Sequence, residues 1–235
     1  NKKYSFSLKK LLFPLLLLLS DTAFAQSLFF EAPVAITKKD TLFPVVLSGE
    51  NEAYLIYEES DGKNLYINFM KRAEGQFKWS SEKRIAGPFS FNGDVPDIFT
   101  AAILDKGTIA VALNLSEYEI GVYTSRDGGN SFAYNKISTS GRRVVAPRIY
   151  KTSRDNFVLF VSMGTENKFT IGYATSNDGI SWSSINNFEP ALQLDDNSFS
   201  PYLCPAHGGD VIVFQSQFAV QGRAKTFQLY TTFSP

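Results

Sequence analysis

The sequence predicts an all-β fold built from a repeated unit of about four strands. Short runs rich in Val, Ile, Phe and Tyr recur along the chain, each bounded by Gly, Asp, Asn or Ser; AYLIYEE, TIAVALNL, NFVLFVSM and DVIVFQSQF are examples. No segment keeps a helical spacing of apolar residues over three turns. A proline next to apolar residues recurs at nearly equal intervals, at Pro44, Pro96, Pro147 and Pro201. A repeat of about 50 residues with about four strands is the period of a β-propeller blade.

Within each unit the elements follow a fixed order. The proline and its apolar neighbours come first, then a turn, a strongly apolar strand, and a strand that carries a tyrosine (Tyr66, Tyr123, Tyr173 and Tyr230). A solenoid with one strand per turn would have a period of roughly 20 to 30 residues, which is too short. We therefore expect blades at about 40–90, 91–140 and 141–195, and an unfinished blade at 196–235, with the residues after each proline starting an innermost strand.

The segment 1–25 resembles a cleavable secretory signal. Four lysines precede and flank the start of an apolar run from Leu11 to Leu19, and Ala23-Phe24-Ala25 supplies an A-x-A site. The apolar run is shorter than the roughly 20 residues that span a bilayer. We predict cleavage after Ala25, export to the periplasm, the cell surface or the medium, and a mature chain without an integral membrane segment.

Charge and cysteine content exclude several classes of function. The chain has 23 basic and 23 acidic residues, so it lacks the basic excess of a nucleic-acid-binding or anionic-membrane-binding protein. Cys204 is the only cysteine and is expected to be a small core residue, and His207 in PAHGGD a turn residue. No metal-ligand set or cofactor motif is present, so we expect neither a metal nor a cofactor.

Two similar stretches, SRDGGNSF (125–132) and SNDGISW (176–182), each follow an apolar strand and lie in phase with the prolines. We interpret both as hairpin turns in which the aspartate accepts backbone hydrogen bonds, glycine adopts positive φ and the aromatic residue anchors the return strand. A calcium loop would need more carboxylates. A nucleophilic serine would need a base, and His207 belongs to one repeat only.

These stretches resemble Asp-boxes, the BNR repeats of the sialidase-like propeller superfamily. The matching residues are Ser125, Asp127, Gly129, Ser131 and Phe132 in the first copy and Ser176, Asp178, Gly179, Ser181 and Trp182 in the second. A degenerate copy, YINFMKRAEGQFKWS, keeps Tyr66, Gly75 and Trp79. The resemblance implies that the boxes are structural, that they lie on the outer-strand hairpins away from the active site, and that this chain is the N-terminal part of a longer protein, most often six-bladed in this superfamily.

The resemblance also implies a test for catalysis. Family sialidases use three arginines, a tyrosine nucleophile next to a glutamate, and an acid/base aspartate, and the first arginine lies in an R-I-P motif. Here the corresponding place holds Leu42 and Phe43 before Pro44. Without that arginine the clamp for a substrate carboxylate is incomplete.

The positions that follow the prolines are nevertheless candidates for a ligand site. They are Val45, Asp97, Arg148 and Tyr202, and propeller geometry would bring them around one channel mouth; Asp94 is a further candidate at the rim. Arg148 and Asp97 could instead pair with each other across neighbouring blades. We expect Glu58 and Glu59 to be solvated at a strand end, and Arg142 and Arg143 to form either a solvated loop or a contact with an acidic ligand.

Three hypotheses follow for function. The first is a non-catalytic exported recognition or scaffold module of a longer protein, with carbohydrate or glycoprotein as its partner. The second is an exo-acting, sialidase-type glycoside hydrolase whose remaining catalytic residues lie beyond residue 235. The third is a coding fragment without independent function, because an open propeller exposes an unpaired strand edge.

Overall fold

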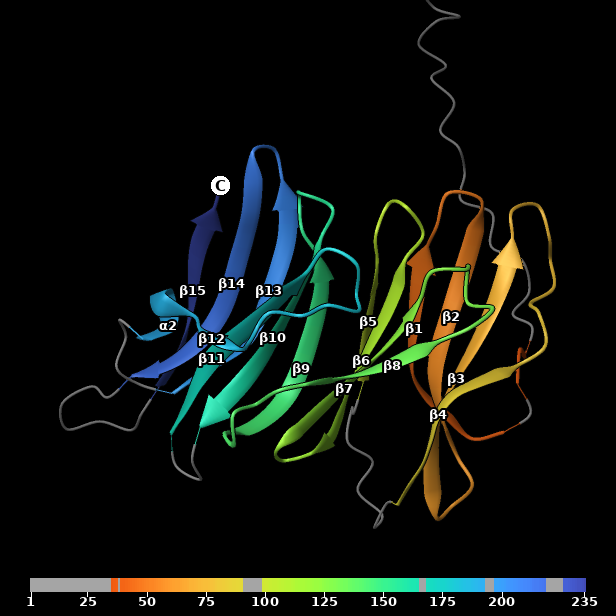
Figure 1. Ribbon diagram of the computed structural model, residues 1–235, viewed down its shortest axis with the longest axis horizontal. Helices are drawn as coiled ribbons and strands as arrows, with labels where there is room; N and C mark the ends of the chain where they lie inside the picture. Colours follow the sequence, from red (N-terminus) through yellow and green to blue (C-terminus); the bar gives the residue numbers. More distant parts are fainter. Residues whose placement is uncertain (1–34, 38, 91–98, 165–167, 193–196, 219–225) are drawn as a thin grey trace, which may run out of the picture. The chain divides into compact units, whose positions relative to one another are not determined.

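The computed structural model describes residues 35–37, 39–90, 99–164, 168–192, 197–218 and 226–235. The predicted signal segment 1–25, together with Asp94 and Asp97, lies outside these residues. Four antiparallel sheets account for most of the described chain, and all belong to one compact unit, Thr37–Pro235. Figure 1 shows the sheets in sequence order, from the orange first sheet to the blue fourth sheet.

Each sheet is a meander of consecutive strands. The first sheet contains β1 (Thr41–Ser48), β2 (Glu52–Ser60), β3 (Asn64–Ala73) and β4 (Lys83–Ser90); the second contains β5 (Phe99–Ile103), β6 (Ile109–Ser116), β7 (Glu119–Ser125) and β8 (Ala133–Ile137). The third contains β9 (Arg143–Lys151), β10 (Phe157–Gly164), β11 (Phe169–Ser176) and β12 (Asn186–Asn187), followed by the short helix α2 (Glu189–Leu192). The fourth contains β13 (Ser198–Ala206), β14 (Gly209–Phe218) and β15 (Thr226–Ser234). The predicted all-β fold and its repeated four-stranded unit are confirmed.

The first strand of each sheet contacts the first strand of the next: β1 with β5, β5 with β9 and β9 with β13. The Ile149 N–H of β9 approaches the Thr100 hydroxyl of β5 at 3.4 Å, and the Tyr150 hydroxyl of β9 donates to the Pro201 carbonyl oxygen of β13 at 3.0 Å. These strands are therefore the innermost ones, as the proline pattern predicts.

The described prolines of the repeat produce a shared irregularity in these inner strands. The register between first and second strand shifts at Phe43-Pro44, at Ala146-Pro147 and at Ser200-Pro201. Proline has no N–H to donate to the sheet, so a bulge accommodates it. Phe43 and Ala146 have positive φ, 47° and 52°. After each bulge, pairing resumes at the residue following the proline: Val45, Arg148 or Tyr202.

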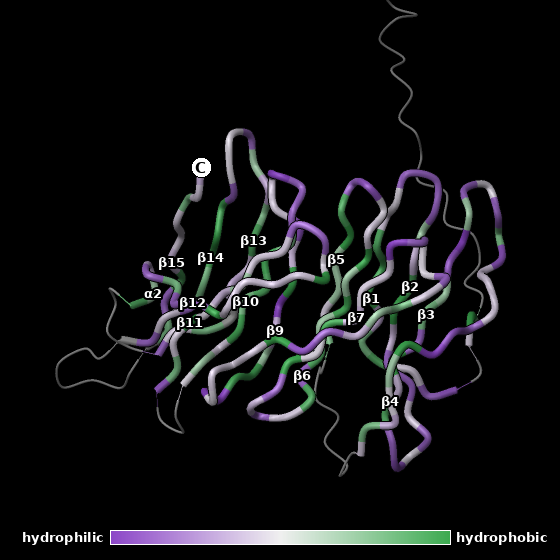
Figure 2. Tube along the Cα trace, viewed as in Figure 1, coloured by the Kyte–Doolittle hydropathy of each residue, from purple (hydrophilic) through white to green (hydrophobic). Residues whose placement is uncertain are grey.

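Three apolar layers fill the spaces between neighbouring sheets. Ile56 and Phe69 of the first sheet pack with Val111 of the second, and Val122 of the second packs with Leu159 of the third. Phe160 of the third sheet packs with Phe214 of the fourth. The second strands β6 and β10 are buried on both faces and so read as continuous apolar runs. Figure 2 shows hydrophilic stretches at the hairpin loops.

Two expectations need correction. Cys204 is exposed, because it lies on the face of β13 opposite to Leu203, and Leu203 is the neighbour that packs against the third sheet. Tyr66 lies near the start of β3 and pairs with Glu59. The residue of β3 that corresponds to Tyr173 is Phe69, because Phe69 pairs with Ile56 as Tyr173 pairs with Phe160. Phe69 and Tyr173 pack toward the following sheet, whereas Tyr123 and Tyr230 pack toward the preceding one, so the tyrosines of the repeat do not share one structural position.

Among the described residues no helix is long and apolar enough to cross a membrane.

Candidate functional site

The stretch 125–132, which we call the first hairpin turn, connects β7 to β8. The Asp127 carboxylate accepts the Ser131 N–H at 2.8 Å and the Ser131 hydroxyl at 2.6 Å. The Ser125 hydroxyl donates to Asp127 Oδ1 and accepts the Gly129 N–H, both at 2.8 Å. These bonds, led by the Ser131 hydroxyl, lower the pKa of Asp127 to about 2. The aspartate thus stays ionised and organises the turn.

The stretch 176–182, the second hairpin turn, lies between β11 and β12 and repeats this network. Asp178 Oδ1 accepts the N–H groups of Ile180 and Ser181, each at 2.8 Å. Burial opposes ionisation of Asp178, but these bonds outweigh it and lower the pKa of that carboxyl. The Trp182 Nε1–H donates to the Gly179 carbonyl at 2.8 Å, and its ring stacks on Phe157. The bonds of both turns therefore stabilise the connection between the third and fourth strands of their sheets.

The candidate ligand residues lie instead on the inner strands. Arg148 and Tyr150 are two residues apart on β9, so their side chains lie on the same face of the third sheet. Their pairing partners on β10, Phe160 and Val158, pack toward the fourth sheet. Tyr202 follows Pro201 on β13, and its side chain is 58% exposed. The Tyr150 hydroxyl bonds to the Pro201 carbonyl oxygen and so links the two strands next to Tyr202.

Tyr150 is the member of this group that sequence reasoning missed. Burial raises its pKa to about 12; the positive charge of Arg148 acts in the opposite direction and the Tyr202 phenol in the same direction. Its phenol is therefore a neutral donor at physiological pH. The signal was present in the sequence, because Tyr150 is two residues after Arg148 and strand side chains two apart share a face.

The Tyr150 phenol is close enough to Arg148 and to Tyr202 for both to act on its pKa. The Tyr202 side chain itself lies on the face of β13 that it shares with Cys204, opposite to Leu203 and away from the third sheet. Val45, the corresponding residue of β1, is half-buried and packs against the core between the first and second sheets. Asp94 and Asp97 are outside the described residues, so the expected pairing of Asp97 with Arg148 remains an expectation. Chemically, a guanidinium and two phenols beside exposed aromatic surface can bind a polar ring by hydrogen bonds and stacking.

Glu58 and Glu59 are buried, which corrects the expectation that both are solvated. Glu58 lies on the same face of β2 as Ile56, toward the second sheet. Glu59 lies on the opposite face, where its carboxylate accepts from Lys39 Nζ at 2.9 Å and from Asn68 Nδ2 at 2.6 Å, with Arg84 Nη2 at 3.7 Å. These partners offset the cost of removing the carboxylate from water. They come from separate segments, so local sequence could not reveal them.

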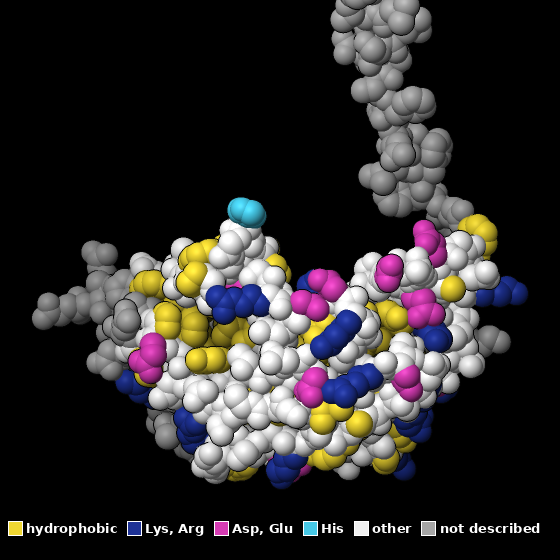
Figure 3. All heavy atoms as spheres, turned by 45° about the horizontal axis from the view of Figure 1, so that its top comes forward, with side chains coloured by type: hydrophobic (Ala, Val, Ile, Leu, Met, Phe, Trp, Pro, Cys, Tyr) yellow, Lys and Arg dark blue, Asp and Glu magenta, His cyan; other side chains and the backbone are white. Residues whose placement is uncertain are grey.

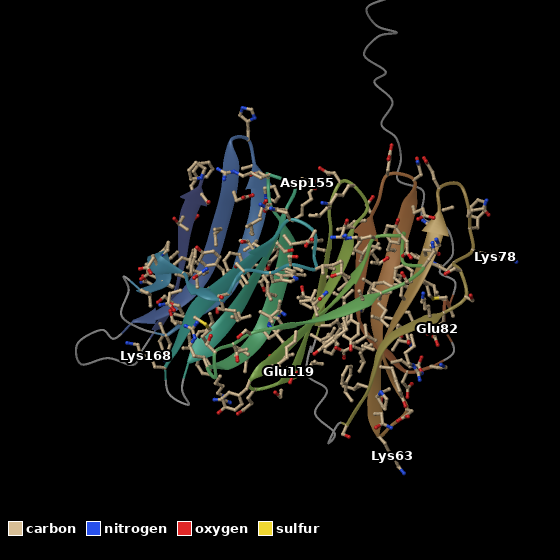
Figure 4. The ribbon with its side chains drawn as sticks, viewed as in Figure 1. Lys63, Lys78, Glu82, Glu119, Asp155 and Lys168 are labelled. Atoms are coloured by element: carbon tan, nitrogen blue, oxygen red, sulfur yellow. The ribbon has the colours of Figure 1, made fainter. Side chains whose placement is uncertain are left out.

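Glu59, Lys39, Asn68 and Arg84 form a polar cluster on this face of the first sheet, and the cluster contains a second acidic residue. Glu82, labelled in Figure 4, lies at 3.1 Å from Lys39 Nζ and accepts the Tyr57 hydroxyl at 2.6 Å. Arg84 also lies over the Tyr66 ring, 3.7 Å from its centroid. The cluster holds β2, β3 and β4 together with the segment that precedes β1.

Arg142 and Arg143 form intramolecular bonds in place of a solvated loop. Arg142 donates to the Ile185 carbonyl oxygen at 2.8 Å and to Asn187 Oδ1 at 3.2 Å. Arg143 pairs with Glu117 at 2.6 Å and lies over the Phe169 ring. Both arginines thus secure the third sheet, and Arg143 joins it to the second.

The described residues contain no group of three or more His, Cys, Asp or Glu side chains that could hold a metal ion. His207 is exposed in the turn between β13 and β14, and the histidine projects from the surface in Figure 3. On that face acidic and basic side chains are interspersed, in keeping with the balanced charge of the chain.

No family model matches the chain, and no curated protein matches it. Among solved structures, it is similar to an α-L-arabinanase of Penicillium chrysogenum in complex with arabinobiose, with a TM-score of 0.54 and 14% identity over 83% of this chain and 62% of that enzyme. The fold is a β-propeller.

Two other propeller neighbours are less similar. An endo-arabinase of Bacteroides thetaiotaomicron has a TM-score of 0.48 at 15% identity, covering 88% of this chain and 80% of that chain. A lectin of Aleuria aurantia in complex with α-methyl-L-fucoside has a TM-score of 0.42 at 14% identity, covering 78% and 56%. The propeller described here spans less than two thirds of the length of the Penicillium enzyme.

Proposed function

We propose that this propeller is a non-catalytic carbohydrate-recognition module of a longer exported protein, and that its ligand binds where β9 meets β13. The observation that carries the proposal is the grouping of Arg148, Tyr150 and Tyr202 on these two inner strands. The sialidase-like resemblance of the two hairpin turns supports the same class of ligand.

The chemistry of the group suits a sugar. The exposed Tyr202 ring offers a flat apolar face on which the C–H groups of a pyranose or furanose ring can stack, and Arg148 offers N–H donors for its hydroxyl groups. Tyr150, whose O–H donates to the Pro201 carbonyl oxygen, offers its hydroxyl oxygen as an acceptor. Sugar recognition by a few polar groups around aromatic surface is also consistent with a nearly neutral protein.

Binding without hydrolysis is favoured over sialidase activity by the inner-strand sequence. Leu42 and Phe43 precede Pro44 where the R-I-P motif would place an arginine, and a sialoside carboxylate would lack that bidentate partner. The arabinobiose bound to the Penicillium arabinanase provides a second probe, an uncharged disaccharide.

The test measures binding and turnover on the same samples. Wild-type protein and Tyr202→Ala are screened on a glycan array that includes arabino-oligosaccharides, fucosides and sialosides, and both are incubated with fluorogenic arabinosides and sialosides. Leu229→Ala is the matched control, because Leu229 is also a surface-exposed residue of the fourth sheet, 71% exposed against 58% for Tyr202, and lies on β15 instead of β13.

We expect at least one glycan class to bind, at least a tenfold loss of affinity for Tyr202→Ala, no change for Leu229→Ala, and no turnover. Turnover that Tyr202→Ala abolishes would establish a hydrolase and overturn the non-catalytic proposal. Folded wild-type protein that binds no glycan would overturn the carbohydrate proposal altogether. N-terminal sequencing of the exported protein tests the signal: a start at Gln26 is expected.

A further inference from the structure

Three phenylalanine rings form a continuous series across the third and fourth sheets. Phe169 begins β11, Phe199 lies near the start of β13, and Phe227 lies near the start of β15. The ring centroids of Phe169 and Phe199 are 5.6 Å apart, and those of Phe199 and Phe227 are 6.0 Å apart. The planes of neighbouring rings are inclined by 48° and 52°, so the rings do not stack face to face on one another. We call these three residues the aromatic strip.

The aromatic strip ends on the face of the fourth sheet that lies away from the third sheet, which we call the outer face. Phe214 of β14 packs toward the third sheet, so Gln217, an odd number of residues further along the strand, lies on the outer face. Phe227 pairs with Gln217 and shares that face, and its side chain is 56% exposed. Tyr202 of the proposed carbohydrate site lies on the same face. The strip therefore leads from the third sheet to the face that carries Tyr202.

The outer face has a composition that suits an uncharged ligand. Its described positions on β13, β14 and β15 hold no Asp, Glu, Lys or Arg side chain. Gln215 is exposed there, and its amide can both donate to and accept from the hydroxyl groups of a sugar. At the other end of the strip, Arg143 lies over the Phe169 ring at 5.7 Å, but its guanidinium pairs with Glu117 at 2.6 Å. The charge of Arg143 thus already has a partner.

Exposed aromatic residues on an uncharged sheet face indicate a binding surface. A protein partner would bury aliphatic and aromatic side chains alike, because the removal of any apolar area from water is favourable. A sugar chain makes a narrower demand, since its C–H faces stack on flat rings and its hydroxyl groups need amides or other polar groups between those rings. The linear order of the three rings, the exposed amide of Gln215 and the continuity with Tyr202 favour the sugar chain.

We propose that the aromatic strip and the outer face bind successive residues of a neutral glycan chain, with one part of the chain on Tyr202 and the remainder on Phe199 and Phe227. The inference rests on the proposed carbohydrate site and deepens it, because it makes the ligand an uncharged oligosaccharide or polysaccharide instead of a single terminal sugar.

The test compares short and long neutral glycans. Disaccharides and hexasaccharides of the arabino, xylo and cello series are titrated calorimetrically into the wild-type protein, Phe227→Leu and Phe227→Trp. Phe227→Leu keeps an apolar side chain but removes the flat ring, whereas Phe227→Trp keeps a ring. Leu229→Ala is the matched control, because Leu229 is an exposed aliphatic residue two positions further along the same face of β15. Thermal unfolding of each variant verifies that it is folded.

We expect the hexasaccharide of at least one series to bind the wild-type protein about tenfold more tightly than the disaccharide, because its additional sugar residues reach the strip. Phe227→Leu should remove most of this gain and leave the affinity for the disaccharide unchanged. Phe227→Trp should keep the gain, and Leu229→Ala should leave the affinities for both lengths unchanged.

Equal affinities for the two lengths in every series, or no binding of any of these glycans, would overturn the inference. The proposed carbohydrate site would still stand in that case if Tyr202→Ala weakened the binding of another glycan from the array. An equal loss with Leu229→Ala and Phe227→Leu would show a general apolar surface and would overturn the inference as well. A wild-type dimer in analytical ultracentrifugation that Phe227→Leu dissociates would assign the outer face to a contact between two copies of the chain, with the same consequence.

Discussion

Thr124 on β7 donates its hydroxyl to the carbonyl oxygen of Gly179 in the second hairpin turn at 2.5 Å. This bond joins the third strand of the second sheet to the outer turn of the third sheet. A Cβ atom on Gly179 would lie 2.8 Å from Thr124 Cγ2. The turn therefore approaches the neighbouring sheet as closely as it does because the residue is glycine, and the hairpin turns help to fix neighbouring sheets to each other.

Gly179→Ala should destabilise the protein by about 2–4 kcal/mol. The residue has a φ of +75°, which disfavours any L side chain, and the new methyl group would displace Thr124. The measurement is the free energy of unfolding from urea denaturation.

Gly75→Ala is the matched control for that substitution. Gly75 has nearly the same φ, +71°, but an added Cβ would meet no atom within 4 Å. Its cost should be about 1 kcal/mol, from backbone conformation alone. Equal costs at the two glycines would show that close approach between the sheets contributes nothing.

Asp127→Ala should lower the free energy of unfolding by about 2 kcal/mol. The substitution removes the acceptor of the Ser131 N–H and hydroxyl and a partner of the Ser125 hydroxyl. Glu74→Ala changes an exposed carboxylate in another outer turn and should have an effect within about 0.5 kcal/mol. A loss at Asp127 no larger than the loss at Glu74 would contradict the structural role of the carboxylate.

The stability advantage of wild type over Asp127→Asn should depend on pH. The folded-state pKa of Asp127 is lowered from its ordinary value of 3.8 to about 2. Its contribution is therefore fully present above about pH 4 and is lost as the pH falls through about 2. Urea denaturation of both proteins between about pH 2 and pH 7 tests this. A difference that stays constant across the range would mean that the ionised carboxylate is not what stabilises the turn.

Glu59→Gln should destabilise the first sheet by about 1–3 kcal/mol, because Lys39 and Arg84 lose their shared buried carboxylate. Lys39 is half exposed, so the effect lies below that of a fully buried pair. The loss should shrink in about 1 M salt, which screens the remaining charges. Glu50→Gln, at an exposed loop position, is the control. A change as small as that of Glu50→Gln would contradict the assigned role of the cluster.

Features that repeat along the chain could be predicted from the sequence. Pro44, Pro147 and Pro201 mark inner-strand bulges because a residue without an N–H disturbs sheet pairing in the same way each time. Asp127 and Asp178 mark outer turns because the backbone N–H groups that they accept lie only a few residues along the chain. Local chemistry determines both features, so a period in the sequence is enough to locate them.

Features that depend on one face of one sheet could not be predicted. The sequence around Glu59 predicts a solvated polar residue at a strand end. Its burial depends on Lys39 and Arg84, which lie about 20 or more residues before and after it in the chain. The sequence predicts Cys204 as a core residue, but it is exposed on the face of β13 away from the third sheet. The spacing of Tyr150 from Arg148 indicates a shared face, but the bond of Tyr150 to the Pro201 carbonyl oxygen depends on the packing of β9 against β13.

The most direct test of the central claim is to map, by amide chemical-shift changes, where a glycan from the array binds on the protein. We predict that the largest changes at saturating ligand fall on Arg148, Tyr150 and Tyr202 and their strand neighbours on β9 and β13. Changes confined to another part of the propeller, or none with a ligand that the array identifies, would contradict it.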